Sequence, residues 1–248
     1  MRLDGKVGIV TGARKGIGEA VAKAMAQEGA DLVLVSRSIK EEDEIVKAVK
    51  ESGRRVRIKQ VDVGDKQQVA NMVKETAEEF GRIDMLFNNA GVSMPTMLLK
   101  MTEEQWHEVL RINLTGAFYC LQEVASVMRE QKSGSILNVT SSAGLNGTIG
   151  QINYTAAKGG VYAMTKSAAK ELARYNVRVN TIAPMAETEM TQTISQDPKF
   201  KEKYLERIPL GRFGKPEEVA PAVVFFLSDD STFITGQTLC VDGGMIML

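Results

Sequence analysis

Two side chains that could move a proton lie four positions apart in the second half of the chain. Tyr154 and Lys158 belong to the run NYTAAKGGVYAMTKSAAKELAR, whose pattern predicts a helix. Residues four apart project from one helical face, so the phenol and the ammonium would be neighbours. A nearby positive charge favours the phenolate, and Tyr154 could then exchange a proton with a carbonyl or alcohol oxygen. The spacing alone is common, however, and usually has a structural role.

A glycine-rich turn follows the first apolar run, KVGIV. In TGARKGIG, the residues Gly12, Gly16 and Gly18 are spaced GxxxGxG and open a segment, 16–28, that predicts a helix. Such glycines let the backbone approach a pyrophosphate, which the positive end of the helix attracts. The spacing differs from the GxGxxG of the standard fingerprint, so the strand-to-helix position carries this prediction of a dinucleotide site.

The end of the second apolar run, DLVLV, indicates which dinucleotide is preferred. An NAD site would usually carry a carboxylate there, but the chain has Ser36 and Arg37. Arg37 can pair with a 2'-phosphate, and Arg14 and Lys15 add positive charge nearby. We therefore expect NADP(H), with NAD(H) as the alternative. The other interpretation is that these residues are solvated cations on a surface turn.

The elements that must position these residues are short β-branched runs separated mostly by amphipathic ones. This alternation is typical of βαβ units that build a parallel sheet. The runs are KVGIV, DLVLV, VRIKQV, MLFNN, SILNVTS, VRVNTI and TLCVD. We predict an α/β protein: a Rossmann-type, doubly wound parallel sheet of about seven strands with helices on both faces. No linker or repeat divides the chain, so a single domain is expected over 1–248.

One polar insertion interrupts this alternation. It runs from Pro184 through PMAETEMTQTISQDPKFKEKYLERIPLGR, with a second proline at Pro209. Long loops of this kind often close over ligands, so the segment 185–212 is a candidate substrate lid. A plain surface excursion is the alternative.

Composition narrows the classes of function. The chain has 31 basic and 31 acidic residues, which gives no bulk charge to attract nucleic acid or a membrane surface. The N-terminus lacks the apolar run of a signal peptide, so a cytoplasmic location is expected. Cys120 and Cys240 are far apart and are expected to be small buried residues, and His107 is expected on a helix surface. No metal site is predicted.

Five ordered motifs together resemble the short-chain dehydrogenase/reductase family along nearly the whole chain. They are TGARKGIG, NNAG at 88–91, Asn113 in RINLTGAF, Ser141 thirteen residues before Tyr154, and the Tyr154–Lys158 pair. The resemblance implies that Ser141 hydrogen-bonds the substrate oxygen and that Tyr154 is the acid/base. Lys158 would hold the nicotinamide ribose and lower the pKa of Tyr154, and Asn113 would bind a water that links Lys158 to solvent.

The same resemblance implies the cofactor contacts. Asp62 and Val63 would contact adenine, the segment 89–91 would line the adenosine ribose side, and Thr188 would bind the nicotinamide carboxamide. The family usually has Pro-Gly where this chain has Pro184 and methionine, so a differently shaped nicotinamide pocket is expected. The complete predicted cofactor set is Gly12, Arg14, Lys15, Gly16, Ile17, Gly18, Ser36, Arg37, Asp62, Val63, Asn89, Ala90, Gly91, Tyr154, Lys158, Pro184 and Thr188.

Within the family, the chain resembles the 3-oxoacyl-(acyl-carrier-protein) reductases most, through its length, its glycine motif and the C-terminal GQTLCVDGGM. The helices at 102–132 and 154–174 and the last strand resemble the surfaces through which this family forms tetramers. The resemblance therefore implies a homotetramer. In those reductases two basic residues beside the active site dock the carrier protein. The matching positions here are Lys132 and Tyr175, with Arg174 adjacent, so docking stays open.

Three functions remain as hypotheses. The first is an NADPH-dependent 3-oxoacyl thioester reductase, and the second is a reductase or dehydrogenase of free ketones and secondary alcohols, cyclic ones included. The third is a non-catalytic dinucleotide sensor that retained the fold. The intact set of Asn113, Ser141, Tyr154 and Lys158 argues against the third.

Overall fold

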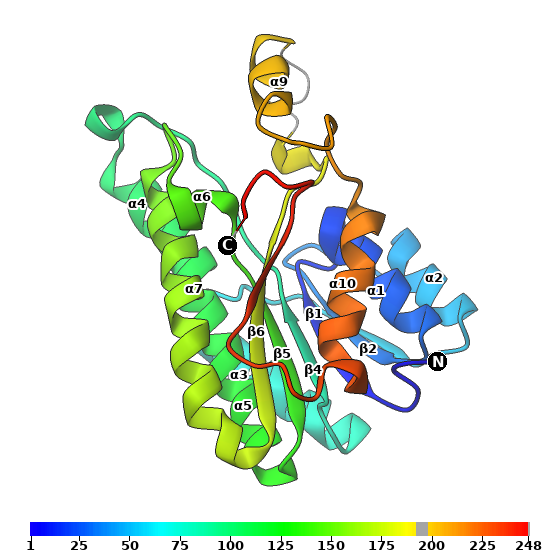
Figure 1. The fold of residues 1–248 in the computed structure, drawn as a ribbon. Helices are drawn as coiled ribbons and strands as arrows, with labels where there is room; N and C mark the ends of the chain where they lie inside the picture. Colours follow the sequence, from blue (N-terminus) through cyan, green and yellow to red (C-terminus); the bar gives the residue numbers. More distant parts are fainter. Residues whose placement is uncertain (192–197, 248) are drawn as a thin grey trace.

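The computed structural model describes residues 1–191 and 198–247, and its strands form one seven-stranded parallel sheet (Figure 1). The spatial order is β3-β2-β1-β4-β5-β6-β7. The strand bounds are β1 Val7–Thr11, β2 Asp31–Val35, β3 Val56–Lys59, β4 Met85–Asn88, β5 Gly134–Val139, β6 Val177–Pro184 and β7 Thr238–Val241. The order reverses between β1 and β4, which is where ligands bind in doubly wound sheets. The predicted fold class is confirmed.

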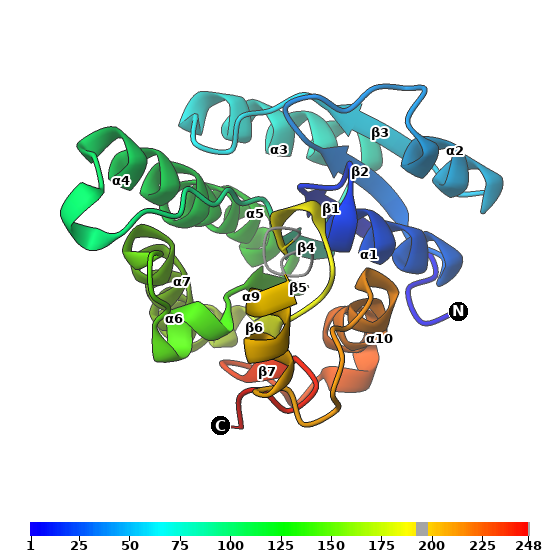
Figure 2. The same cartoon turned by 90° about the horizontal axis from the view of Figure 1, so that it is seen from above.

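Helices cover both faces of the sheet (Figure 2). On one face lie α1 Gly16–Gln27, α2 Glu44–Glu51 and α10 Pro216–Leu227, and on the other lie α3 Lys66–Phe80, α5 Ala117–Gln131 and α7 Ile152–Leu172. The shorter helices and turns are η1 Leu98–Lys100, α4 Glu103–Leu110, η2 Arg111–Gly116, α6 Ser142–Asn146, η3 Ala173–Tyr175, η4 Glu189–Thr191, α9 Pro198–Leu205 and η5 Asp229–Ser231. In the described residues, no helix has the length and apolar character that a membrane crossing requires.

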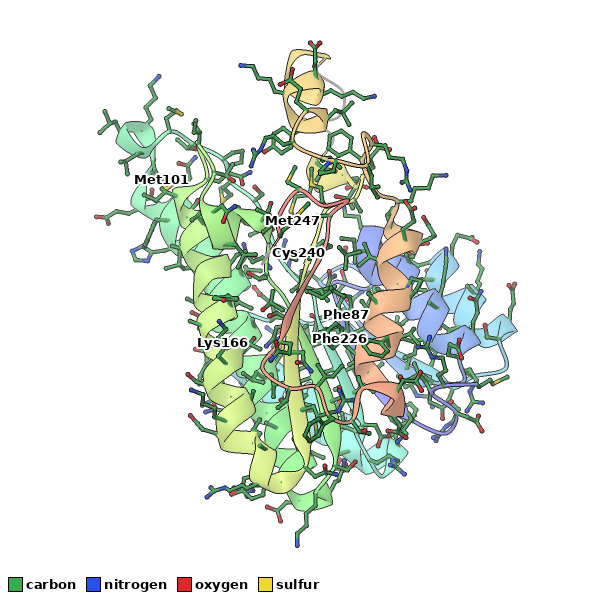
Figure 3. All side chains as sticks on the ribbon, viewed as in Figure 1. Phe87, Met101, Lys166, Phe226, Cys240 and Met247 are labelled. Atoms are coloured by element: carbon green, nitrogen blue, oxygen red, sulfur yellow. The ribbon has the colours of Figure 1, made fainter. Side chains whose placement is uncertain are left out.

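The central strands are apolar on both faces because helices cover both. Every residue of β1 and of β2 is buried, as a parallel sheet between two helical layers requires. Phe87 of β4 is fully buried, and Phe226 of α10 lies near it in the same apolar core (Figure 3). At about 25 cal/mol per Å² of apolar surface removed from water, these layers supply the main driving force for folding.

The edge of the sheet differs from its centre. Strand β7 has only one neighbour, β6, and its residues are only partly covered. Cys240 lies on this strand and is half-exposed, so the expectation that both cysteines are buried is wrong for Cys240. Cys120 on α5 is fully buried, and burial raises the pKa of its thiol to about 12. An edge strand loses burial because nothing packs against its outer side.

The predicted helix at 102–132 is interrupted at Asn113. Thr102 and Gln105 form a capping box that starts α4, and His107 is exposed on this helix, as expected. A π-helical turn, η2, then joins α4 to α5 without a break in direction. Such turns insert an extra residue into a helix and often occur at functional sites.

Candidate active site

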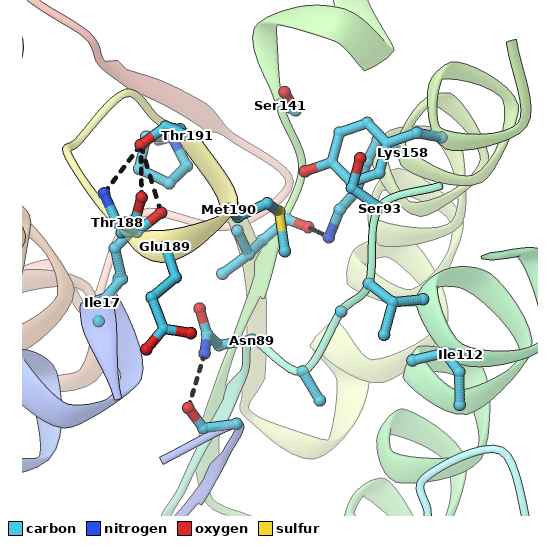
Figure 4. Close-up of a pocket in the computed structure, with 18 of the residues that line it drawn as sticks. Ile17, Asn89, Ser93, Ile112, Ser141, Lys158, Thr188, Glu189, Met190 and Thr191 are labelled. Carbon is cyan, nitrogen blue, oxygen red and sulfur yellow. Dashed lines mark hydrogen bonds between the residues drawn. The ribbon is translucent and has the colours of Figure 1, made fainter. Parts of the chain in front are cut away.

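A cavity of about 510 Å³ opens at the carboxyl ends of the central strands (Figure 4). The glycine turn after β1, the segment after β4, the end of β5, the start of α7 and the end of β6 all contribute to it. The predicted site residues that line it are Gly12, Arg14, Lys15, Gly16, Ile17, Ser36, Arg37, Asp62, Val63, Asn89, Ala90, Gly91, Ser141, Tyr154, Lys158, Pro184 and Thr188. Gly18 and Asn113 do not line it.

The glycine turn has the geometry of a phosphate cradle. Gly12 and Gly16 have φ values of +66° and +62°, which side chains rarely permit. A Cβ atom on Gly12 would lie 2.8 Å from the Asn89 side-chain nitrogen, so the turn and the next loop are in close contact. Helix α1 starts without a side-chain cap, which leaves its N–H groups for an anion. These features fit a dinucleotide phosphate.

Gly18, which is predicted to contact the cofactor, has a packing role in the turn. It is buried, and a Cβ atom there would lie 2.1 Å from the Gly12 carbonyl oxygen. The third glycine of the motif therefore lets helix α1 approach the turn, which is the helix-packing role that such a glycine has in dinucleotide folds.

Thr11, which the sequence analysis did not select, holds the loop after β4 against the glycine turn. Its hydroxyl accepts hydrogen bonds from the backbone N–H groups of Asn89, at 2.9 Å, and Ala90, at 3.0 Å. The Asn89 side chain donates in turn to the Thr11 carbonyl at 3.0 Å. The only sequence signal for this role of Thr11 was its position directly before Gly12 in the motif.

At the adenosine end of the cavity, Arg14 is held in place by two partners. Its guanidinium donates to Asp43 at 3.1 Å and to the hydroxyl of Ser38 at 3.2 Å. Ser36 and Arg37, directly after β2, lie beside Ser38 along the same wall. Lys15 forms an ion pair with Glu189 of η4, which joins the glycine turn to the lid segment.

Asp62 lies three residues beyond the end of β3, which is shorter than its predicted run. Burial alone would raise the pKa of Asp62, but hydrogen bonds from the Arg111 guanidinium and the Gly64 N–H outweigh it and lower the pKa. Arg111 lies 3.0 Å from the Asp62 carboxylate. Asp62 is therefore a fixed anion, and Val63 is buried next to it in the cavity wall.

Ser141, Tyr154 and Lys158 line the other end of the cavity; Ser141 and Lys158 are labelled in Figure 4. Ser141 caps α6, where its hydroxyl accepts from the Ala143 N–H at 3.2 Å, and it lines the cavity together with Tyr154. Burial raises the pKa of Tyr154, and the Ser141 hydrogen bond offsets this only in part. The net shift is therefore opposite to the lowered pKa that the resemblance implied, because loss of hydration dominates. Ser142 also lines the cavity, but Ser141 is the serine that affects the pKa of Tyr154.

Lys158 is a buried cation with a fixed direction. Its ammonium donates to the Val139 carbonyl at 2.7 Å and lies 5.7 Å from the centre of the Tyr154 ring. Burial lowers the pKa of Lys158 to about 8. The Thr140 hydroxyl donates to the Lys158 carbonyl at 2.7 Å, so the end of β5 holds both the side chain and the backbone of this residue.

Asn113 has a structural contact that the sequence analysis did not predict. Its side chain accepts from the Val92 N–H and donates to the Val92 carbonyl, both at 2.7 Å. It is fully buried within the π-helical turn. The side chain therefore holds the segment after β4.

The lid segment contributes several residues that the sequence analysis did not select. Met185 and Met190 line the cavity beside Pro184 and Thr188. Met185 does not use the left-handed backbone region that glycine would permit there, and it packs with Ile208 and Phe213 at the base of the lid. Residues 192–197 of the predicted lid lie outside the described residues.

The positions considered for carrier-protein docking are far from this cavity within the chain. Lys132 follows the last residue of α5, and Tyr175 ends η3, just before β5 and β6 begin. Because α7 has 21 residues, Tyr175 lies about 30 Å from Tyr154. These residues are therefore not beside the active site of their own chain. In the described residues, no cluster of three or more His, Cys, Asp or Glu side chains could hold a metal ion.

Comparison with known proteins agrees with this geometry. Residues 12–246 match a family described as enoyl-(acyl carrier protein) reductase. The chain is 45% identical over 248 residues to the 3-oxoacyl-(acyl-carrier-protein) reductase FabG of Thermotoga maritima, with all of both chains covered. It is 44% identical to the 3-oxoacyl-(acyl-carrier-protein) reductase of a Synechocystis strain, over 99% of this chain and 98% of that one.

Solved structures give the same result. Levodione reductase is 38% identical with a TM-score of 0.93, and 98% of each chain is covered. NAD⁺-bound xylitol dehydrogenase is 35% identical with a TM-score of 0.92, over 98% of this chain and 100% of that one. The chain is therefore a member of the short-chain dehydrogenase/reductase family of oxidoreductases.

Proposed function

We propose that this protein reduces ketones with NADP(H), that 3-oxoacyl thioesters are its substrate class, and that Tyr154 is the proton donor. The observation that carries the proposal is the grouping of Ser141, Tyr154 and Lys158 in the same cavity as the glycine turn 12–17. A ketone beside the phenol would then lie within reach of a dinucleotide on the turn. The thioester substrate is taken from the names of the Thermotoga and Synechocystis relatives.

The proton step follows from the surroundings of Tyr154. Because its pKa is raised, the phenol is protonated at neutral pH and can act as an acid. The bound reduced nicotinamide supplies a hydride to the carbonyl carbon. As the carbon–oxygen double bond opens, the oxygen takes the phenolic proton of Tyr154, which completes a secondary alcohol. The Ser141 hydroxyl lies beside the phenol and can hydrogen-bond the same oxygen.

Lys158 and Asn113 support this step in different ways. The ammonium of Lys158 is fixed by Val139 close to the phenol, so it stabilises the phenolate that remains after proton transfer. It also faces the cavity, where it can hold the nicotinamide ribose. Asn113 acts on the segment after β4 through its two bonds to Val92.

The preference for NADP(H) rests on the charges after β2. Ser36, Arg37 and Ser38 line the cavity there, and Arg14 is directed to the same wall by Asp43. A 2'-phosphate would find two guanidinium groups and hydroxyl donors. NAD(H) remains the alternative, because the related xylitol dehydrogenase structure contains NAD⁺.

Replacing Arg37 tests this preference. We expect Arg37→Asp to lower kcat/KM for NADPH by about 10- to 100-fold, the range of one lost charged hydrogen bond, and to change NADH use much less. Lys50→Asp, an exposed cation on α2 that pairs with Glu41, is the control. An unchanged ratio of NADPH to NADH use in Arg37→Asp would remove the assignment.

A second candidate is a reductase or dehydrogenase of free ketones and secondary alcohols. The structural similarity to levodione reductase and xylitol dehydrogenase favours it, because neither name describes a thioester. The chemistry at Tyr154 is the same in both cases. The two candidates therefore differ only in what the cavity mouth accepts.

One assay separates the candidates. NADPH and NADH oxidation is measured with acetoacetyl thioesters of coenzyme A and of acyl carrier protein, and with a panel of free ketones. Tyr154→Phe serves as the blank. Thioester reduction supports the first candidate, and reduction of free ketones alone supports the second. Dinucleotide binding without turnover on any substrate would indicate a non-catalytic sensor.

The wider organisation is part of the same proposal. The chain is one domain over 1–248, with a lid at 185–212 whose residues Thr188 and Met190 face the cavity. It is a cytoplasmic homotetramer, and its exposed apolar residues near β7, Phe233 and Leu239, are available for subunit contact. Light scattering after size exclusion gives the subunit number, and cell fractionation gives the location.

A further inference from the structure

Asn153, the residue before Tyr154, is fully buried and joins three separate parts of the backbone. Its amide nitrogen donates to the Met94 carbonyl at 3.2 Å and to the Gln105 carbonyl at 3.1 Å. Its amide oxygen accepts from the Tyr154 N–H at 2.8 Å. One side chain therefore connects the segment after β4, the first turn of α4 and the first turn of α7.

The segment after β4 is a wall of the active-site cavity. Ser93 lines the cavity and is drawn near Lys158 in Figure 4. On one side of Ser93, Asn113 holds Val92 through both of its backbone groups. On the other side, Asn153 holds Met94. The wall is thus fixed at both ends by buried asparagines.

We propose that Asn153 is a positioning residue for the reaction: it sets the separation between the Tyr154 phenol and the wall that contains Ser93. The inference rests on the proposed function, in which Tyr154 donates the proton. A ketone would lie between this wall and the phenol, so its distance from the proton depends on Asn153. Misplacement by about 1 Å can cost about 100-fold in rate.

An asparagine is well suited to this task. It provides two donors and an acceptor on a short, branched group, so it can bind two carbonyls and one N–H at once. Aspartate of the same shape would place a negative charge against the Met94 and Gln105 carbonyls. Alanine would leave two buried carbonyls and one N–H without this partner.

Asn180 offers a matched control. It is also fully buried, donates to the Ile234 carbonyl at 2.9 Å and accepts from the Gln237 N–H at 2.9 Å. It lies in β6 and does not line the cavity. Loss of its side chain therefore removes comparable buried hydrogen bonds without touching the wall or the phenol.

The experiment compares Asn153→Ala with Asn180→Ala. Thermal unfolding, NADPH affinity by fluorescence, and steady-state kinetics are measured below the unfolding temperature of both variants. We expect both to be less stable and to keep NADPH affinity, but only Asn153→Ala to lose kcat, by about 100-fold. Hydrogen exchange should accelerate at 92–96 and at Tyr154 in Asn153→Ala, and at Gln237 in Asn180→Ala.

Asn153→Ser is the second variant in case alanine prevents folding, because serine is well tolerated at the start of a helix. The same loss of kcat is expected. The inference is overturned if the kcat of the folded Asn153 variants equals that of the wild type, or if Asn180→Ala loses as much. If the wild type itself reduces no substrate, the proposed function fails instead, and unchanged exchange at 92–96 and Tyr154 would still reject the role of Asn153.

Discussion

Helix α7 carries the tyrosine–lysine spacing twice, and the two pairs have opposite surroundings. Lys166 lies over the ring of Tyr162, 3.9 Å from its centre, and its ammonium contacts the phenol oxygen. Lys166 is on the outer surface of the helix (Figure 3). Lys158 is 5.7 Å from the centre of the Tyr154 ring and instead donates to Val139. The pair in direct contact is thus the exposed one, outside the cavity.

This difference shows that a four-residue spacing on a helix brings a tyrosine and a lysine near each other but does not by itself determine their pKa values. At the surface, water screens the ammonium, and the contact is worth a few tenths of a kcal/mol. In the cavity, burial raises the pKa of Tyr154 and lowers that of Lys158 to about 8. Ser141 and Val139, both from the end of β5, give each group a direction. In the proposed mechanism, the neighbouring strand, not the helix, is what distinguishes the first pair.

The strongest test of this comparison replaces each tyrosine. We expect Tyr154→Phe to lower kcat for ketone reduction by about 1000-fold, because the acid is lost. Tyr162→Phe removes the same oxygen from the exposed pair and should leave kcat near that of the wild type. Steady-state NADPH oxidation measures both variants. Activity of Tyr154→Phe close to that of Tyr162→Phe would contradict the assignment.

Replacement of the two lysines should affect kcat as differently as replacement of the two tyrosines, but the loss of kcat should be smaller. We expect Lys158→Met to lower kcat by about 100-fold, and Lys166→Met to change it little. Because the pKa of Lys158 is about 8, reduction by the wild type should slow as the pH rises through that value and the ammonium is lost. Lys166→Met should keep this limb of the pH–rate profile, and Lys158→Met should lack it. A limb near pH 8 in both variants would assign it to another group.

Two threonine substitutions give the smallest expected effect on kcat. The variant that loses more stability should be the one that keeps its kcat. The Thr140 hydroxyl binds the Lys158 carbonyl, so Thr140→Val should cost about 1 kcal/mol of stability and lower kcat a little. The Thr165 hydroxyl accepts from the Asn138 amide, which would lose its buried partner in Thr165→Val, so about 1–3 kcal/mol is expected. Its kcat should be unchanged. Denaturant unfolding measures the stability of both variants, and steady-state kinetics measures their kcat. If the less stable variant also has the lower kcat, the comparison is refuted.

Most of the fold could be predicted because it follows from local patterns. All seven strands coincide with the short runs named in the sequence analysis, six of which contain β-branched residues, and the glycine turn lies where the first run ends. The parallel order follows because each strand-to-strand connection is long enough for a helix. The cavity then brings together side chains that follow the ends of different strands, such as Arg37 and Ser141.

Predictions failed where one residue had to be placed against a distant one. The hydrogen bonds of the Asn113 side chain to Val92, twenty-one positions away, were not predicted. Tyr154 was expected to have a lowered pKa, but burial, which depends on packing, dominates. The sequence likewise did not reveal that Tyr175 lies at the far end of α7 from Tyr154. Nothing in local spacing encodes these distances.

The sequence by itself determined the kinds of groups available and the order of elements that carry them, because propensity and hydrophobic period act over short stretches of chain. Only the tertiary structure decided which of two similar pairs on α7 lies in the cavity and which carbonyls Asn153 binds. These depend on desolvation and on hydrogen bonds across several ångströms between segments far apart in sequence.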